Sequence, residues 1–325
     1  MIQEIVLPPA FHRDPTAARF ITDDLARFWQ AFEHLDAPDA ERVFEALYLD
    51  AGTDGLHAFT ASRIETATHL VRKVRSCRAY YAALSPGTNR VETSLPAIRA
   101  AYVHLASLYD EAVFPDTTFV MGRLSSGGTI ADAGLLIGTE FFTRDAMTPV
   151  HELSAWELGT TQNVAALPFI VAHELIHAQQ FVALQGQLPE APTLLWQCLL
   201  EGAAEYIGAV ISGRVTTPAL HAYGRAHEAA LWARFEQERH QTSWEGWLYE
   251  GDRTDGIPAD LGYFVGARIC EAYVARQQDR HVAVKDVIVR ALDDPEGFLL
   301  ESGYASKIEE LQKHSGGATS VTFKG

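Results

Sequence analysis

The sequence His173-Glu174-Leu175-Ile176-His177 lies in an apolar segment, residues 165 to about 184, that predicts a buried helix. Residues four apart lie on one face of a helix, so the imidazoles of His173 and His177 can bind one small cation together. Glu174 then lies beside that cation as a candidate general base. Burying these three polar side chains without a metal or hydrogen-bond partners would be costly. The alternative is two core histidines that bond to neighbouring polar groups.

A second motif, Glu201-Gly202-Ala203-Ala204-Glu205, lies on a helix predicted from Thr193 to Ile211. A catalytic zinc ion with two histidine ligands needs a third protein ligand and an open position for water, and Glu201 is the predicted third ligand. Glu205 falls on the same helix face. Metal-bound histidines usually donate their second N–H to a carboxylate or carbonyl, so Glu205 is predicted to orient His173 or His177. The roles of the two glutamates could be exchanged.

Two short β-rich runs before the first motif, 117–121 and 134–142, predict a small sheet beside the motif helix. Residues 125–129, Ser-Ser-Gly-Gly-Thr, predict a flexible connection between these runs. Gly127 and Gly128 would suit an edge strand that pairs with an extended peptide substrate. A surface loop that joins two strands is an equally good interpretation.

The fold class predicted from these patterns is α+β and predominantly helical. We expect a helical N-terminal region (1–113), a core with the small sheet and both motif helices (114–213), a helical C-terminal lobe (214–314) and a tail (315–325), all forming one catalytic unit. The stretch from Ser243 to Leu261 is rich in Gly, Asp and Trp and is predicted to form a cleft rim or lid.

Composition and charge narrow the class of protein. The 325 residues, with 47% hydrophobic and 21% charged side chains, are typical of a soluble globular enzyme, and no apolar run predicts a membrane span. The net charge of −16 disfavours nucleic acid and anionic membranes as partners. Cys77, Cys198 and Cys270 are predicted to be buried free thiols. The N-terminal residues do not resemble a secretory signal, so a cytoplasmic location is expected.

The order His-Glu-x-x-His, then a helix bearing Glu-Gly-x-x-Glu, resembles the gluzincin metallopeptidases, the group that includes thermolysin and the zinc aminopeptidases. The chain also resembles a family of bacterial predicted zinc-dependent proteases of uncharacterised function. This second resemblance is carried by Phe114-Pro115-Asp116, Gly122-Arg123, Ser126-Gly127-Gly128-Thr129, Gly134-Leu135-Leu136-Ile137-Gly138, the motif helix and Gly262-Tyr263-Phe264-Val265-Gly266. Both resemblances imply a zincin-like fold, one catalytic Zn²⁺ and hydrolysis of a peptide or protein substrate.

The mechanism that the resemblance implies is metal-assisted addition of water to an amide carbonyl, with Glu174 as general base. Gluzincins often stabilise the resulting oxyanion with a Tyr or His from the C-terminal lobe. Tyr263 is the first candidate here because it follows the predicted rim and opens a helix, and Tyr249 and His240 come next. The amino-terminus recognition segment of zinc aminopeptidases is missing, which disfavours an exopeptidase.

Two alternative functions remain open. One is a zinc amide or ester hydrolase that does not act on peptides. The other is a catalytically silent module in which zinc supports peptide binding or regulation. The presence of Glu174 argues against this second class, because a structural zinc site needs no general base and is usually closed by a fourth ligand. His151, His221 or His227 could close the site, but all three are expected at the surface.

Peptide deformylase chemistry also uses His-Glu-x-x-His, with a cysteine upstream as the third ligand. The upstream cysteine of this chain, Cys77, lies in a predicted amphipathic helix far from the motif. The sequence therefore disfavours this class of enzyme.

Overall fold

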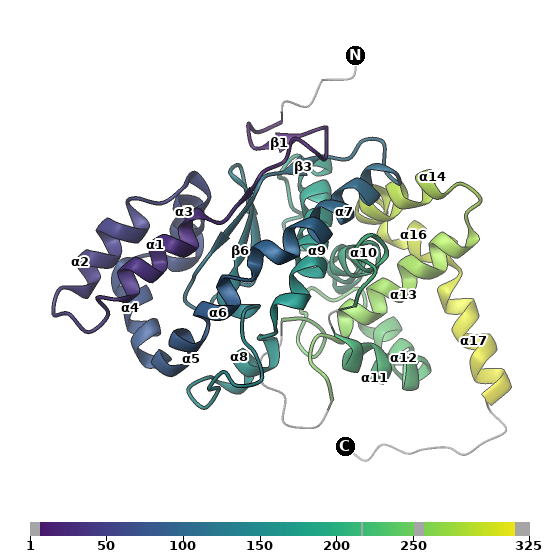
Figure 1. Ribbon diagram of the computed structural model, residues 1–325. Coiled ribbons are helices and arrows are strands. Elements are labelled where there is room, and N and C mark those ends of the chain that lie inside the picture. Colours follow the sequence, from purple (N-terminus) through teal and green to yellow (C-terminus); the bar gives the residue numbers. More distant parts are fainter. Residues whose placement is uncertain (1–6, 216, 250–256, 316–325) are drawn as a thin grey trace. The chain divides into compact units, whose positions relative to one another are not determined.

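The computed structural model describes residues 7–215, 217–249 and 257–315 (Figure 1). The described residues form two compact units. The first unit consists of the described residues in 1–185 and 207–216, and the second of those in 186–206 and 217–325. The structure is α+β and predominantly helical, as predicted.

Two segments predicted from the sequence are only partly covered by the described residues. Part of the predicted rim (250–256) and nearly all of the predicted tail (316–325) lie outside the described residues.

Helices make up most of the first unit. The α-helices are α1 (Asp23–Phe32), α2 (Ala40–Phe44), α3 (Asp54–Phe59), α4 (Ala67–Ser76), α5 (Arg78–Ala83), α6 (Ser85–Thr88), α7 (Leu95–Ala106), α8 (Ala155–Thr160) and α9 (Leu167–Ala183). Shorter turns are the π-helical η1 (Glu45–Leu49) and η2 (Thr60–Ile64) and the 3₁₀ turns η3 (Val91–Ser94), η4 (Thr139–Phe141) and η5 (Val164–Ala166). Leu70 and Val74 of α4, four residues apart, are fully buried, as are Ile98 and Tyr102 of α7. The apolar stripes of the N-terminal region are therefore core packing.

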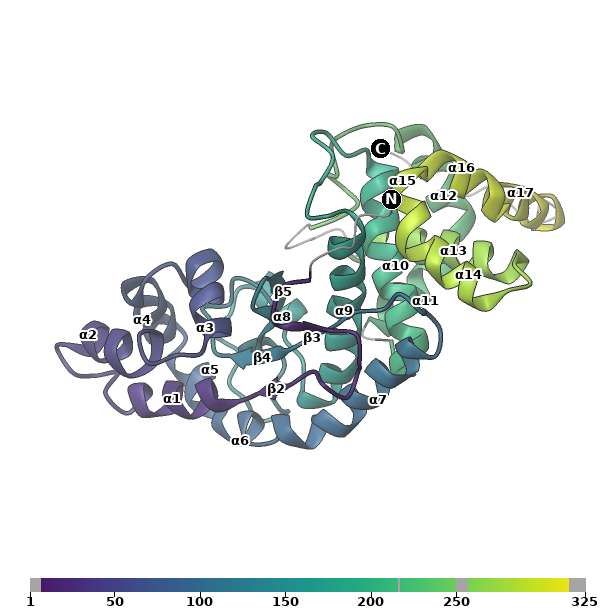
Figure 2. The same cartoon turned by 90° about the horizontal axis from the view of Figure 1, so that it is seen from above.

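The sheet of the first unit has the strand order β2-β4-β6-β5. Its strands are β2 (Phe20–Ile21), β4 (Thr117–Val120), β5 (Gly128–Ala131) and β6 (Gly134–Gly138), and a separate pair joins β1 (Phe11–His12) to β3 (Phe114–Pro115). β2, β4 and β6 run parallel, whereas β5 is antiparallel to β6 and forms an edge of the sheet (Figure 2).

This arrangement confirms the small sheet and corrects two details. Gly128 and Thr129 belong to the edge strand β5, so they are not part of a flexible connection. Gly134 permits the tight reversal from β5 into β6, because its φ of 106° favours glycine. The run predicted to extend to Phe142 leaves the sheet at Gly138 and continues as the 3₁₀ turn η4.

Helices cover both faces of this sheet (Figures 1 and 2). α3 contacts β4 and β6, and α9 contacts β5 and β6. Thr118, Leu136 and Thr129 are cross-strand neighbours and share one face, and a Cβ at Gly55 of α3 would meet Thr118. A Cβ at residue 128 would point to the other face, because side chains alternate along a strand. The motif helix α9 therefore packs beside the sheet, as predicted, on the face opposite α3.

The helix α10 (Leu194–Ser212) contributes residues to both units. By length and composition it could cross a membrane, but 78% of its most apolar stretch is buried, which is typical of a core helix. The second unit continues with α11 (Pro218–Ala226), α12 (Glu228–Glu238), α13 (Leu261–Arg276), α14 (Arg280–Lys285), the π-helical η6 (Asp286–Arg290), α15 (Ala291–Asp293), α16 (Pro295–Ser302) and α17 (Tyr304–Ser315). The C-terminal part is therefore helical, as predicted. Cys77, Cys198 and Cys270 are buried free thiols, also as predicted.

Candidate metal centre

The side chain of Gln179 fixes α9 against the strand region of the first unit. Its Oε1 accepts from the backbone N–H of Val113 at 2.8 Å, and its Nε2 donates to the Val113 carbonyl at 2.8 Å. Pro168 lies in the first turn of α9, where its missing N–H costs no intrahelical bond. α9 begins at Leu167, two residues after the predicted start, because residues 164–166 form the 3₁₀ turn η5. Gln179 limits the rotation of the helix about its own axis.

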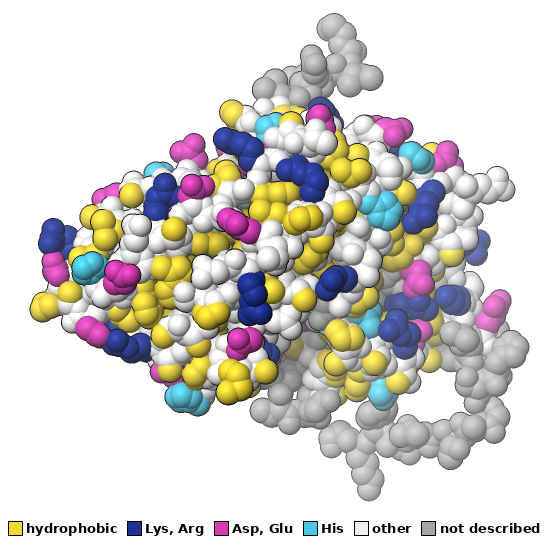
Figure 3. Space-filling model, in the orientation of Figure 1, with side chains coloured by type: hydrophobic (Ala, Val, Ile, Leu, Met, Phe, Trp, Pro, Cys, Tyr) yellow, Lys and Arg dark blue, Asp and Glu magenta, His cyan; other side chains and the backbone are white. Residues whose placement is uncertain are grey.

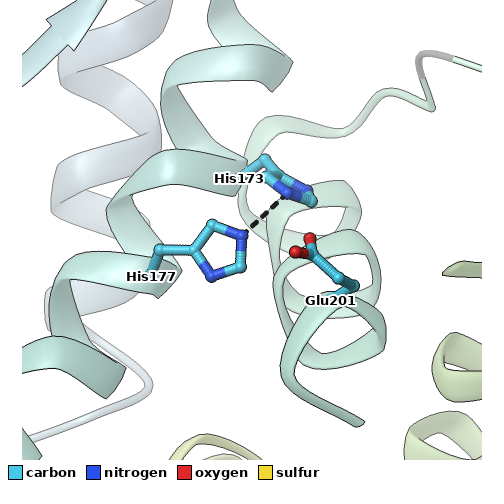
Figure 4. Close-up of side chains that lie close together, drawn as sticks. All are labelled: His173, His177 and Glu201. Atoms are coloured by element: carbon cyan, nitrogen blue, oxygen red, sulfur yellow. Dashed lines mark hydrogen bonds between the residues drawn. The ribbon is translucent and has the colours of Figure 1, made fainter. Parts of the chain in front are cut away.

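His173 and His177 point toward each other from successive turns of α9 (Figure 4). Their Nε2 atoms are 3.1 Å apart, and the two rings are nearly perpendicular, at 81°. Two nitrogens bound tetrahedrally to zinc at about 2.0–2.1 Å would be about 3.3 Å apart. The two imidazoles are therefore arranged to bind one ion through their Nε2 atoms.

Gln180 completes the arrangement around His177. Nδ1–H of His177 donates to Oε1 of the buried Gln180 at 2.7 Å. A proton held on Nδ1 leaves the lone pair on Nε2, which is the tautomer that a metal requires. The sequence analysis missed this residue, although its position three residues after His177 places it on the same helix side.

The end of α10 lies against α9. A Cβ at Gly208 would be only 3.2 Å from the backbone of His173, and Arg214 Nη1 donates to the Ala165 carbonyl at 3.0 Å. Glu201 lies two helical turns before Gly208, a spacing that places both on one face of α10. Close approach of the helices at Gly208 thus carries Glu201 toward the histidines.

His173, His177 and Glu201 each offer one ligand atom, and these atoms all lie within 4.8 Å of one another (Figure 4). Glu201 is buried, with 6% of its surface exposed. Two imidazoles and one carboxylate are a donor set that zinc uses in catalytic sites, with a further position left for water or substrate. The residues that the sequence nominated as ligands are thus brought together, and their chemistry fits a zinc ion.

The carboxylate of Glu174 faces the edge strand β5. A Cβ added at Gly128 would lie 2.5 Å from Glu174 Oε1 and 2.6 Å from its Cδ, so only glycine fits there without displacing the carboxylate. Gly127 lies against the ring of Phe142, whose Cζ would be 2.9 Å from an added Cβ. Gly128 therefore brings the strand backbone close to the candidate general base, whereas Gly127 packs against an aromatic ring.

Tyr249 contacts the candidate ligand Glu201. Its hydroxyl donates to Glu201 Oε1 in a short hydrogen bond and accepts from Nε2 of Gln197 at 2.6 Å. Tyr249 has a φ of 58°, an uncommon backbone conformation for a residue other than glycine. Desolvation around the hydroxyl, together with the Glu201 carboxylate, raises the pKa of Tyr249, so its hydroxyl keeps its proton at neutral pH.

The other two oxyanion candidates lie elsewhere in the second unit. Tyr263, in the first turn of α13, packs edge-on against the Tyr249 ring, with centroids 6.5 Å apart. His240 is mostly exposed and lies 3.2 Å from Glu296. The hydroxyl of Tyr249 thus contacts a predicted ligand.

Glu205 and His221 form a buried pair in the second unit. Nε2 of His221 lies 2.7 Å from Glu205 Oε1, and only 8% of His221 is exposed. The surface position expected for His221 is therefore wrong, because the carboxylate offers this imidazole a buried partner. His151 and His227 are exposed, as predicted. The role of Glu205 in orienting a ligand histidine stays a prediction.

A buried carboxyl group that the sequence analysis missed supports the loop before β5. Glu140 accepts from the backbone N–H groups of Gly122 at 2.8 Å and Leu124 at 3.1 Å. Burial raises the pKa of Glu140 to about 7, and these N–H donors offset part of the rise. Its signal in the sequence was a single acidic residue within an otherwise apolar run.

Residues 153–290 match the model of a family described as predicted Zn-dependent protease (DUF2268). This match includes the His-Glu-x-x-His helix, Glu201 and the two tyrosine candidates. No curated protein and no solved structure matches the chain. The match covers less than half of the chain, and the description of the family suggests a zinc-dependent protease.

Proposed function

We propose that the protein is a zinc-dependent metallopeptidase of the gluzincin type with a zincin-like fold. The observation that carries the proposal is the convergence of His173, His177 and Glu201, with ligand atoms within 4.8 Å of one another, beside Glu174 on the same helix. The description of the matched family supports the same class of enzyme. His173, His177 and Glu201 would hold one Zn²⁺, which supplies Lewis-acid polarisation of the peptide carbonyl and of a water molecule.

The edge strand β5 is the proposed binding site for the peptide backbone. The Gly138 N–H donates to the Gly127 carbonyl at 3.0 Å. Along β5, the backbone groups of successive residues point alternately toward β6 and away from it, and this bond shows that those of Gly127 point toward β6. The backbone groups of Gly128 and Ile130 then face away from β6, toward the edge where an extended peptide can add. Because Gly128 also lies against Glu174, the peptide would be held beside the general base.

Glu174 accepts the proton of the attacking water and delivers it to the leaving amine. This role requires a carboxylate within reach of both groups, and Gly128 leaves it the necessary room. The hydroxyl of Tyr249 is favoured as the donor to the oxyanion: it lies at Glu201, and its single proton would turn from Glu201 to the oxyanion. Tyr263 is the second candidate. Glu205 is proposed to orient a ligand histidine, with His221 holding its carboxylate.

The proposed substrate is a peptide or protein. On the face shown in Figure 3, basic side chains are interspersed among acidic ones. Together with the net charge of −16, this disfavours nucleic acid and anionic membranes. Three buried free thiols are in keeping with a reducing compartment, and we propose a cytoplasmic location.

The decisive experiment combines metal analysis with a peptide-library cleavage assay on the purified protein. We expect one zinc per chain and cleavage of library peptides by the wild type. Glu174→Gln should retain zinc and lose cleavage. Glu236→Gln, the same change at an exposed residue of α12, is the matched control and should cleave normally.

Each alternative has its own outcome in this experiment. One zinc per chain without Glu174-dependent cleavage would favour the catalytically silent module. Hydrolysis of small amides or esters, with no peptide cleaved, would favour the non-peptidase hydrolase. Absence of bound zinc after loading would contradict the proposal itself.

A further inference from the structure

Arg63 is held against the edge strand β5 by its side chain and by its backbone. Its Nη2 donates to Thr129 Oγ1 at 3.1 Å. Its carbonyl accepts from Arg123 Nε at 2.8 Å and from Ser125 Oγ at 2.9 Å, both in the segment that leads into β5. The guanidinium therefore has a defined position at one side of the proposed peptide-binding edge.

Arg63 is a partly buried cation without a carboxylate partner among the residues that the structure describes. Its neighbour Arg123 is paired with Glu65 at 2.6 Å. Arg63 makes one side-chain hydrogen bond, to a neutral hydroxyl, and its buried Nε has no hydrogen-bond partner in the described part of the protein. A guanidinium is a rigid fork of donors that matches a carboxylate, and burying it without an anion is costly. Its surroundings therefore suit an incoming carboxylate.

The alternation of β5 places Arg63 and Glu174 on opposite faces of the sheet. Thr129 shares its face with Thr118, which faces α3, whereas Gly128 faces Glu174 on α9. A peptide strand added to β5 would alternate in the same way. Its side chains would point in turn toward the face of Glu174 and toward the face of Arg63.

The ladder also identifies the peptide residue that would meet Arg63. Thr129 is paired with Leu136 of β6. Gly127 and Gly138 form a hydrogen-bonded pair, and every second pair along the ladder does the same, so Thr129 and Leu136 are also hydrogen-bonded to each other. An antiparallel peptide would then face Thr129 in a non-hydrogen-bonded pair, in which opposing side chains are closest, with Cβ atoms about 4.5–5.5 Å apart. An acidic side chain at that position would lie beside Thr129 Oγ1 and within reach of the guanidinium.

We infer that Arg63 gives the protein a preference for peptides with Asp or Glu at the position opposite Thr129, next to the residue that faces Gly128 and Glu174. This inference rests on the proposed peptidase function. The acidic residue should therefore lie within about two positions of the cleaved bond, since adjacent residues of a strand are about 3.3 Å apart.

The test uses peptides that the library assay shows to be cleaved, each made with a single Asp or a single Asn at successive positions. Cleavage is compared for the wild type, Arg63→Gln, Arg63→Glu and the control Arg42→Gln. Arg42 is an exposed arginine of α2, so its variant carries the same charge change away from β5. A second readout is the binding of fluorescein-labelled peptides to zinc-loaded Glu174→Gln, with and without Arg63→Gln.

We expect Asp at one position to raise kcat/KM about tenfold over Asn, the size of a charge-assisted hydrogen bond in a partly exposed site. Arg63→Gln should remove this preference, Arg63→Glu should reverse it in favour of Asn, and Arg42→Gln should keep it. An acidic preference that survives in Arg63→Gln, or no acidic preference in the wild type, would overturn the inference while leaving the peptidase function intact.

Failure of the proposed function gives a different result, in which the wild type cleaves no peptide. The binding readout still decides the role of Arg63 in that case, using random library peptides that contain Asp or Asn. Equal binding of acidic and neutral peptides would overturn the inference. Tighter acidic binding that Arg63→Gln removes would support it as a property of a peptide-binding module.

Discussion

The backbone of Gly128 lies against the carboxylate of Glu174, so closely that a Cβ at residue 128 would be 2.5 Å from Glu174 Oε1. The free edge of the sheet and the candidate general base are therefore in direct contact. This relationship ties the proposed substrate site to the proposed chemistry and leads to the first prediction.

Gly128→Ala should lower kcat/KM by about 100-fold, because the new methyl group must displace the Glu174 carboxylate. The clash involves the end of a side chain, so the protein should still fold and bind zinc. Gly159→Ala is the control: Gly159 lies in α8, and a Cβ there meets no described atom within 4 Å. Full activity of Gly128→Ala would contradict the role assigned to Glu174.

Gln180→Leu should weaken zinc binding about tenfold to 100-fold, because His177 loses the acceptor that keeps the proton on Nδ1. Gln180→Glu retains an acceptor oxygen and should keep most of the affinity. Competition with a fluorescent zinc chelator measures both variants. Unchanged zinc affinity in Gln180→Leu would show that Gln180 does not orient the ligand.

Zinc should stabilise the folded protein, because the three ligands are assembled only in the native state. At free zinc 100-fold above its dissociation constant, the free energy of unfolding should rise by about 2.7 kcal/mol. Urea unfolding with and without a chelator measures this difference. His177→Ala should abolish it, whereas His151→Ala, at an exposed position, should retain it. A zinc effect that survives in His177→Ala would argue against the site.

Tyr249→Phe should lower kcat by about 100-fold at saturating zinc if its hydroxyl donates to the oxyanion. Tyr263→Phe, which removes the hydroxyl of the second candidate and keeps its ring contact with Tyr249, is measured beside it. Measuring zinc affinity separately distinguishes this role from support of Glu201, which would weaken zinc binding and leave kcat unchanged. A larger loss in Tyr263→Phe would reverse the assignment.

Glu140 should make stability fall as the pH rises. Burial raises its pKa from 4.5 to about 7 in the folded protein, so between these values the folded state holds a proton that the unfolded state has lost. The free energy of unfolding should therefore decrease by about 3 kcal/mol across this window and stay level above it.

Glu140→Gln removes this titration. The unfolding free energy of the wild type minus that of Glu140→Gln, both measured in urea, should therefore decrease from pH 4.5 to pH 7. Taking this difference cancels the titration of the zinc ligands, because both proteins carry them. A constant difference would show that the carboxyl group does not titrate in this range.

Local periodicity made much of this protein predictable. The four-residue spacing of His173 and His177 places both imidazoles on one face, because every α-helix has the same internal hydrogen-bond pattern. Glu201 was nominated as the third ligand because a catalytic zinc with two histidines needs one more protein ligand, and its carboxylate lies near both imidazoles. The β-rich runs predicted the small sheet because they are short apolar runs bounded by turn residues, and β4 and β6 are indeed buried along their whole length.

The failures of prediction concern contacts between residues far apart in the chain. His221 was expected at the surface, yet Glu205 on another helix gives it a buried partner. Residues 125–129 were open to two interpretations, a connecting loop or an edge strand, and pairing with β6 decided for the strand at Gly128 and Thr129. In both cases the deciding partner comes from another element.

By itself, the sequence determined the residue types of the site, the helix faces that carry them and the predominantly helical α+β class. Tertiary structure alone decided that Gly128 meets Glu174, that Tyr249 meets Glu201 and that Arg63 meets Thr129. The physical reason is the range of the forces involved. Backbone hydrogen bonding sets side-chain direction within a few residues, whereas long-range contacts depend on how whole helices and strands pack.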